Sequence, residues 1–138
     1  MGRKVIEALG GMDAARGKQV ALLGLTFKPN TDDMRDAPAI AIAQTLADAG
    51  VSLSAHDPEG MEQARPLLPH VDMARDAYAA ATGADAVVIV TEWDAFRALD
   101  FARIKGLMNA PVLVDLRNIY QPGEVRAAGF EYVSVGRG

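Results

Sequence analysis

The segment QVALLGLTFKPNTDDMRDAP, residues 19–38, decides how the chain is read. Its first five residues are nearly all apolar, which is typical of a strand covered on both faces of a sheet. An alanine-rich pattern with helical spacing follows from Ala37 to Ala49, and Pro38 suits its first turn. The connection between them, Gly24–Pro38, holds one lysine, one arginine and three aspartates. So long and charged a connection predicts a binding loop, because open α/β sheets bind ligands where strands end.

Four more apolar runs after this segment predict strands, and stretches with helical features separate them. Strands that alternate with helices indicate an α/β fold with a Rossmann-like, doubly wound and mostly parallel sheet of five to six strands. Right-handed crossovers would then bring the carboxyl ends of all strands to one edge. The further strands are expected at 51–55, 86–90, 112–114 and 130–135, and helices at 3–9, 37–49, within 59–68, at 75–82, after Asp100 and at 122–129.

Polar and charged residues gather at that expected edge. Besides loop 24–38, they comprise His56-Asp57, Thr91-Glu92-Trp93 and the segment DLRN at 115–118. For Trp93 we favour packing beneath the following loop over a stacking platform for a base. Asp36 and Gly50 would cap the helix between them at its start and its end. The edge is therefore the predicted ligand site.

Composition narrows the function further. With 138 residues, half of them hydrophobic and 23% charged, the chain is expected to be one globular domain. The net charge of −4 argues against a general binder of nucleic acid or anionic membranes. No apolar run approaches the roughly 20 residues of a membrane span, and the first residues lack a secretory signal. There is no cysteine for a disulfide, a thiolate metal site or a nucleophile, so we expect a cytoplasmic location.

A complete dinucleotide site is not predicted, although the topology invites one. After Gly24 come Leu25 and Thr26, without the further glycines of G-x-G-x-x-G, and no phosphate loop is present. Asp57 stands where a ribose-binding acid would, which by itself is a weak signal. No acid–base pair or activated nucleophile can be recognised, so no catalytic residue is predicted.

Cations at the edge are the candidate ligand contacts. Lys28 and Arg117 could hold a pyrophosphate, although simple solvation of each side chain remains open. Arg35 lies near a helix start, where a cation opposes the helix dipole. It either reaches a ligand phosphate or is neutralised by neighbouring aspartates. Those aspartates, Asp32, Asp33 and Asp36, are better explained as turn and cap residues than as metal ligands, so no metal site is predicted.

Four motifs in order carry a resemblance to a known family: GLTFKPNTDDMRDAP, HDPEGMEQARPLL, TEWDAFRALDF and PVLVDLRNIY. They are similar to the C-terminal UDP-binding domain of the UDP-glucose/GDP-mannose dehydrogenase family. The resemblance covers residues 17–138, and residues 1–16 look like the end of a helix and linker that precede that domain. We therefore expect a C-terminal fragment with an upstream remainder.

The resemblance implies an activity and roles for particular residues. The family oxidises the C6 alcohol of a nucleotide sugar in two NAD-dependent steps through a cysteine thioester, using an N-terminal Rossmann domain and a central region. Because this chain has neither part, it would be inactive alone. Phe27 and Lys28 would contact the UDP-sugar, Arg117 the UDP part, and Arg35 the NAD held mainly by the other domain.

The implied partners are UDP or UDP-glucose, the other domains of the enzyme and, in the full-length protein, further copies of itself. The face formed by Val5, Ile6 and Leu9 is expected to be exposed, which would favour self-association of the fragment. The TEWDAFR segment looks more like members that use UDP-glucose. The alternatives are a UDP-N-acetylhexosamine 6-dehydrogenase and, from another class, a non-enzymatic nucleotide-binding or dimerisation module.

Overall fold

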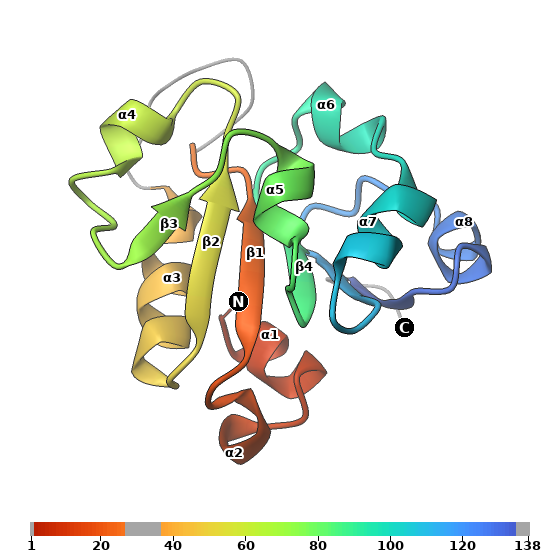
Figure 1. Ribbon diagram of the computed structural model, residues 1–138, viewed down its shortest axis with the longest axis horizontal. Coiled ribbons are helices and arrows are strands. Elements are labelled where there is room, and N and C mark those ends of the chain that lie inside the picture. Colours follow the sequence, from red (N-terminus) through yellow and green to blue (C-terminus); the bar gives the residue numbers. More distant parts are fainter. Residues whose placement is uncertain (1, 27–36, 135–138) are drawn as a thin grey trace.

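A twisted parallel sheet forms the centre of the molecule (Figure 1). The computed structural model describes residues 2–26 and 37–134, and within these ranges the sheet has six strands in the order β3-β2-β1-β4-β5-β6. Every neighbouring pair is parallel. The Rossmann-like prediction is confirmed, with all strands parallel rather than most. The strands are β1 Gln19–Leu23, β2 Ser52–His56, β3 Val71–Met73, β4 Ala86–Ile89, β5 Val112–Asp115 and β6 Glu131–Ser134.

Helices cover both faces of this sheet, because successive residues of a strand point to opposite sides. In β1, Val20 and Leu22 enter one core, whereas Ala21 and Leu23 enter the other, and all four are fully buried. The first core contains residues of α1 and α3, and the second contains residues of α5, α7 and α8. The helices are α1 Gly2–Ala8, α2 Met12–Ala15, α3 Pro38–Asp48, α4 Met61–Ala64, α5 Ala77–Ala81, α6 Asp94–Arg97, α7 Phe101–Leu107 and α8 Pro122–Ala127.

Helix α3 ends as the sequence predicts. Gly50 has a φ of 84°, and its amide donates to the Ala47 carbonyl at 3.0 Å. The next amide, that of Val51, donates to the Leu46 carbonyl at 3.0 Å. These two bonds are the Schellman arrangement, which satisfies carbonyls at a helix end. At the start of α3, the position before Pro38 is occupied by Ala37, and the predicted cap Asp36 lies outside the described residues.

The expectation of an exposed apolar face at the amino end is wrong. Val5 is fully buried and Ile6 is 6% exposed, because α1 packs against α3 and joins the first core. Leu9 is partly buried against the same core. The short helix is therefore stabilised by its own domain, and these three residues give no reason for self-association.

Three elements have no counterpart in the sequence-based expectations. Helix α2 is a single turn of four residues that buries Ala15. Strand β3 has three residues, of which Val71 is buried, and it pairs with β2 as an edge strand. Helix α6 is a single turn that buries Phe96. All three are shorter than the stretch over which a period of 2 or 3.6 becomes visible.

Candidate functional site

The loops after β1, β4 and β5 come together at the carboxyl edge of the sheet, beside the point where the strand order reverses. Such a switch point is the usual ligand crevice of an open α/β sheet. Gly24 makes the close approach possible: its φ is 97°, and a Cβ there would lie 2.6 Å from the backbone nitrogen of Thr91. A side chain at this position would therefore collide with the end of β4. The glycine that opens loop 24–38 therefore allows the chain to pass close to Thr91.

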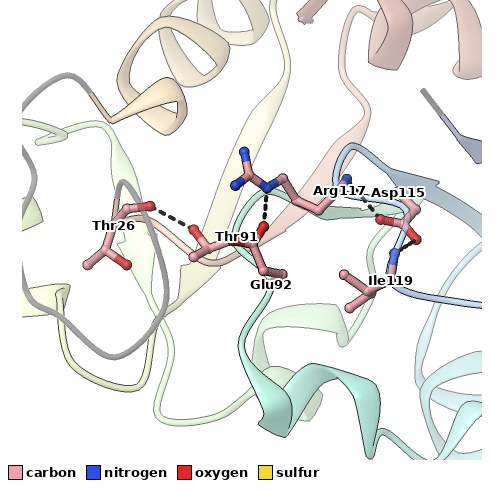
Figure 2. Close-up of polar contacts among 6 residues, drawn as sticks. All are labelled: Thr26, Thr91, Glu92, Asp115, Arg117 and Ile119. Atoms are coloured by element: carbon pink, nitrogen blue, oxygen red, sulfur yellow. Dashed lines mark hydrogen bonds and ion pairs between the residues drawn. The ribbon is translucent and has the colours of Figure 1, made fainter. Parts of the chain in front are cut away.

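A buried threonine ties the start of the binding loop to the end of β4. The Thr91 hydroxyl donates to the backbone carbonyl of Thr26 at 2.8 Å, and both residues are fully buried (Figure 2). Thr26 is the last described residue before 27–36. The hydrogen bond therefore fixes where the loop leaves the sheet.

Asp115, at the end of β5, shapes the turn that carries Arg117. One oxygen of its fully buried carboxylate accepts the Arg117 amide at 3.0 Å. The other accepts the amides of Ile119 at 2.8 Å and Tyr120 at 3.2 Å, and the Tyr132 hydroxyl at 2.8 Å. The carboxylate thus holds the backbone of its own loop, and with it the Cα of Arg117.

Two further residues support this turn. Asn118 has a φ of 57°, a left-handed conformation that asparagine tolerates better than most residues. The Tyr120 hydroxyl donates to the Phe96 carbonyl. Burial, with a smaller contribution from Asp115, raises the pKa of Tyr120 above its ordinary value, so the phenol remains a neutral donor. The turn is therefore anchored to the second core.

The side chain of Arg117 is held as well. Its Nε donates to a carboxylate oxygen of Glu92, and the two side chains are 29% and 27% exposed (Figure 2). The hydrogen bond from Arg117 lowers the pKa of Glu92, and the hydrogen bond to Glu92 raises the pKa of Arg117. Figure 2 shows the two terminal nitrogens turned away from Glu92. Simple solvation does not describe this cation, because its direction is set by a neighbour.

Asp57 has a different role from the ribose-binding acid of a dinucleotide fold. Its carboxylate is fully buried and accepts six hydrogen bonds of 2.7–3.3 Å from described residues. Because both oxygens are engaged internally, this carboxylate is a structural hub of the edge. The donors are the amides of Leu25, Thr26, Glu59 and Gly60, the Thr26 hydroxyl and the indole of Trp93.

Trp93 packs in the second core and is 7% exposed. This burial agrees with the prediction that it anchors the following loop rather than offering a stacking surface. Its indole N–H, 3.2 Å from Asp57, gives the buried polar tip a partner. The loop after β4 is therefore joined to the hub as well.

Of the sequence-predicted contacts, Arg117 lies at the expected edge. Phe27, Lys28 and Arg35 lie outside the described residues, as do the aspartates at 32, 33 and 36. The roles of Thr26, Thr91 and Asp115 escaped sequence reasoning, although each directly follows or ends an apolar run. No group of three or more potential metal ligands occurs in the described part of the chain. No described helix has the length and apolar character to cross a membrane.

The fold and the edge together define a Rossmann-like α/β domain that presents an oriented guanidinium at the carboxyl edge of its sheet. Comparison with known proteins narrows this class. The profile of the UDP-glucose/GDP-mannose dehydrogenase family, UDP binding domain, matches residues 21–122. The chain belongs to this family.

Proteins with similar sequences support this family assignment. The chain is 62% identical over 137 residues to a UDP-glucose 6-dehydrogenase of Rhizobium meliloti (strain 1021), covering 99% of this chain and 31% of that protein. It is 44% identical over 141 residues to a UDP-glucose 6-dehydrogenase of Pseudomonas aeruginosa, covering 96% of this chain and 31% of the relative. The chain therefore spans about a third of the length of these relatives.

Solved structures of dehydrogenases have the same fold. A UDP-glucose dehydrogenase from Pyrobaculum islandicum superposes with a TM-score of 0.74 at 31% identity, covering 96% of this chain and 28% of the other. An NDP-N-acetyl-D-galactosaminuronic acid dehydrogenase from Methanosarcina mazei Go1 superposes with a TM-score of 0.81 at 29% identity, covering 96% and 27%. The likeness extends over nearly the whole of this chain.

Proposed function

We propose that this chain is the UDP-sugar-binding portion of an NAD-dependent UDP-glucose 6-dehydrogenase, which oxidises C6 of UDP-glucose twice to give UDP-glucuronate. The observation that carries the proposal is Arg117, held at the ligand crevice by Asp115 and Glu92 with its terminal nitrogens turned away from the pair. A planar guanidinium matches the oxygens of a diphosphate. The relatives in sequence are named UDP-glucose 6-dehydrogenases, and we propose glucose as the sugar on that ground.

The remaining contacts are those that the resemblance to the family implies. Phe27 and Lys28 come directly after Thr26, which is fastened to Thr91 at the crevice. We assign them to the UDP-sugar, so that Lys28 and Arg117 approach the ligand from two different strand ends. Arg35 is assigned to NAD, which is bound mainly by another domain of the enzyme.

The residues of this chain would bind and orient rather than react. Its sequence has no cysteine to form a thioester. The described residues also do not fit a complete NAD site, because Asp57 is engaged internally and Gly24 packs against Thr91. Holding the nucleotide so that C6 of the sugar faces the other domain would still lower the barrier by restricting its motion.

Calorimetric titration of UDP and UDP-glucose into the chain tests the site. Arg117→Ala should weaken UDP binding roughly tenfold to a hundredfold, because charge-assisted hydrogen bonds to the diphosphate are lost. Arg16→Ala is the matched control, since Arg16 is exposed and precedes β1 at the opposite edge of the sheet. Equal affinity for UDP in parent and Arg117→Ala would show that the assignment of Arg117 is wrong.

A separate experiment tests whether this chain binds the nucleotide sugar while other domains carry out the oxidation. Purified chain mixed with UDP-glucose and NAD should produce no NADH, because the hydride acceptor site and the nucleophile lie elsewhere. Measurable NADH would overturn this part of the proposal. The genomic reading frame ahead of Met1 should encode G-x-G-x-x-G and a cysteine. A stop codon there would favour a free-standing nucleotide-binding or dimerisation module instead.

A second substrate class has one observation in its favour. The NDP-N-acetyl-D-galactosaminuronic acid dehydrogenase of Methanosarcina mazei shares the fold closely, with a TM-score of 0.81. Competition between UDP-glucose and a UDP-N-acetylhexosamine for the full-length enzyme separates the two. Higher kcat/KM with UDP-glucose is expected, and the reverse preference would identify a UDP-N-acetylhexosamine 6-dehydrogenase.

A further inference from the structure

We propose that Glu92 is a positioning residue of the nucleotide site, which sets the direction in which Arg117 presents its guanidinium. The inference rests on the proposed function, in which Arg117 contacts the diphosphate. Glu92 accepts the Nε–H of Arg117 and follows directly after Thr91, which holds the start of the binding loop. These two consecutive residues, just after β4, thereby join the loops after β1 and β5.

The choice of nitrogen determines how a phosphate can approach. A guanidinium has five N–H donors, and a side-on fork would use Nε together with one terminal nitrogen. Because Glu92 occupies the Nε–H, the side-on fork is closed. The two terminal nitrogens remain, and no described residue hydrogen-bonds either of them. Glu92 therefore leaves an end-on fork for the diphosphate.

Holding the backbone of Arg117, as Asp115 does, does not by itself orient the guanidinium. Asp115 fixes the backbone of Arg117, yet the arginine side chain loses considerable rotamer freedom when a ligand immobilises it. Glu92 restricts the last rotatable bonds before the ligand arrives, so less freedom is lost on binding. The pair is partly exposed, and such pairs contribute little to net stability. Its removal can therefore separate orientation from folding.

The charge of Glu92 opposes binding, which makes the inference testable. A carboxylate beside a diphosphate repels it, so the orienting effect and the electrostatic effect of Glu92 have opposite signs. Glu92→Ala removes both effects. Glu92→Gln removes the charge but keeps an amide oxygen that can accept the Nε–H. If Glu92 instead only shields Arg117 until UDP displaces it, Glu92→Ala should bind more tightly than the parent.

The experiment is a calorimetric titration of UDP into the parent chain, Glu92→Ala, Glu92→Gln and Arg117→Ala. Glu92→Ala should weaken UDP binding about threefold to tenfold, the value of an ordinary hydrogen bond. Glu92→Gln should bind at least as tightly as the parent, with a steeper salt dependence because a repulsive charge is gone. Glu62→Ala is the matched control: it removes one acid and an exposed ion pair with Arg65, and it should leave UDP affinity unchanged.

A spectroscopic signature distinguishes positioning from a structural role. The Nε–H proton of Arg117 should exchange slowly in the parent and in Glu92→Gln, and fast in Glu92→Ala, with the thermal midpoint nearly unchanged. If Glu92→Ala does not fold, Glu92→Gln decides: a retained slow proton with undiminished affinity supports the inference, and a lost slow proton with undiminished affinity overturns it.

The outcomes also separate the two proposals. If Arg117→Ala binds UDP like the parent, the assignment of Arg117 itself fails. If Arg117→Ala weakens binding while Glu92→Ala leaves it unchanged or strengthens it, the Glu92 inference is overturned and the proposed function stands.

Discussion

Two buried aspartates at the proposed ligand edge have different structural roles. Asp57, after β2, and Asp115, at the end of β5, are both fully buried and both accept backbone amides. Asp57 collects Leu25, Thr26 and Trp93 from 31 to 36 positions away, and so joins three loops. Asp115 accepts three amides, all from within the five residues that follow it, and a hydroxyl from β6. One carboxylate assembles the edge, whereas the other shapes a single turn.

The edge therefore contains residues of two kinds: some stabilise the fold, and others hold a side chain in the direction of a ligand. The loop start at Leu25 and Thr26 depends on a distant acid, so its position is a property of the whole fold. Arg117 depends on an acid two positions before it and on Glu92 at the neighbouring strand end. Perturbing the first region should therefore appear mainly in the free energy of unfolding, and perturbing the second mainly in ligand affinity.

The largest effect is expected for Asp57→Asn. Whichever oxygen becomes the amide nitrogen, at least two backbone N–H donors lose their acceptor, because Glu59 and Gly60 share one oxygen and Leu25 and Thr26 the other. Each stranded buried donor costs about 1–3 kcal/mol, so the free energy of unfolding should fall by roughly 2–6 kcal/mol. Urea unfolding followed by Trp93, the only tryptophan in the sequence, measures it.

The matched control is Asp100→Asn at the exposed start of α7, where asparagine is an equally good cap. This variant should unfold like the parent. A loss no greater in Asp57→Asn than in the control would remove the distinction between a hub and an ordinary cap.

Asp115→Asn is expected to lose less unfolding free energy than Asp57→Asn, and more UDP affinity. The remaining oxygen can still accept Ile119, Tyr120 and Tyr132, so the Arg117 amide is the donor left without a partner. One stranded amide corresponds to about 1–3 kcal/mol of unfolding free energy. Because that amide belongs to the proposed ligand residue, calorimetry should record weaker UDP binding. Unchanged UDP affinity in a folded variant would contradict the link between this turn and presentation.

The bond between strand ends should contribute about 1 kcal/mol. Thr91→Val keeps the shape of the side chain but removes the hydroxyl that donates to the Thr26 carbonyl across 65 positions. Thr82→Val removes a hydroxyl-to-carbonyl bond as well, yet that one is exposed and reaches only Tyr78, four positions away. Denaturant unfolding should therefore show a greater loss for Thr91→Val than for Thr82→Val, and equal losses would argue against a special role of the buried bond.

Much of the fold could be predicted because its determinants are local. The expected strands at 19–23 and 86–90 lie within one residue of β1 and β4, and Asp100 caps α7 as expected, accepting the Arg103 amide at 3.1 Å. Parallel topology then follows from alternating strands and helices. These inferences need only neighbours in the sequence.

The rest depends on contacts between distant residues. Nothing in the segment around Asp57 indicates that Trp93 donates to it, and Val5 is buried because α1 packs against α3, far away in the sequence. Arg117 could be singled out by its residue type and its position after a strand. Its partner could not, because the pairing with Glu92 requires that β4 and β5 be neighbours in the sheet. The sequence thus indicates a candidate ligand residue but not the neighbour that orients it.

The smallest expected effect on stability is a pH dependence from Glu92. The hydrogen bond from Arg117 holds the pKa of Glu92 in the folded chain below the ordinary value, which is about 4.3. The group therefore contributes stability above that value, and the contribution is lost as pH falls through the lowered folded pKa. For a partly exposed pair it should stay below about 1 kcal/mol. Unfolding free energies of the parent and Glu92→Gln should accordingly differ more at pH 6 than at pH 3. A difference that grows toward acid would mean that the folded state favours the protonated acid, contrary to an ion pair that presents Arg117.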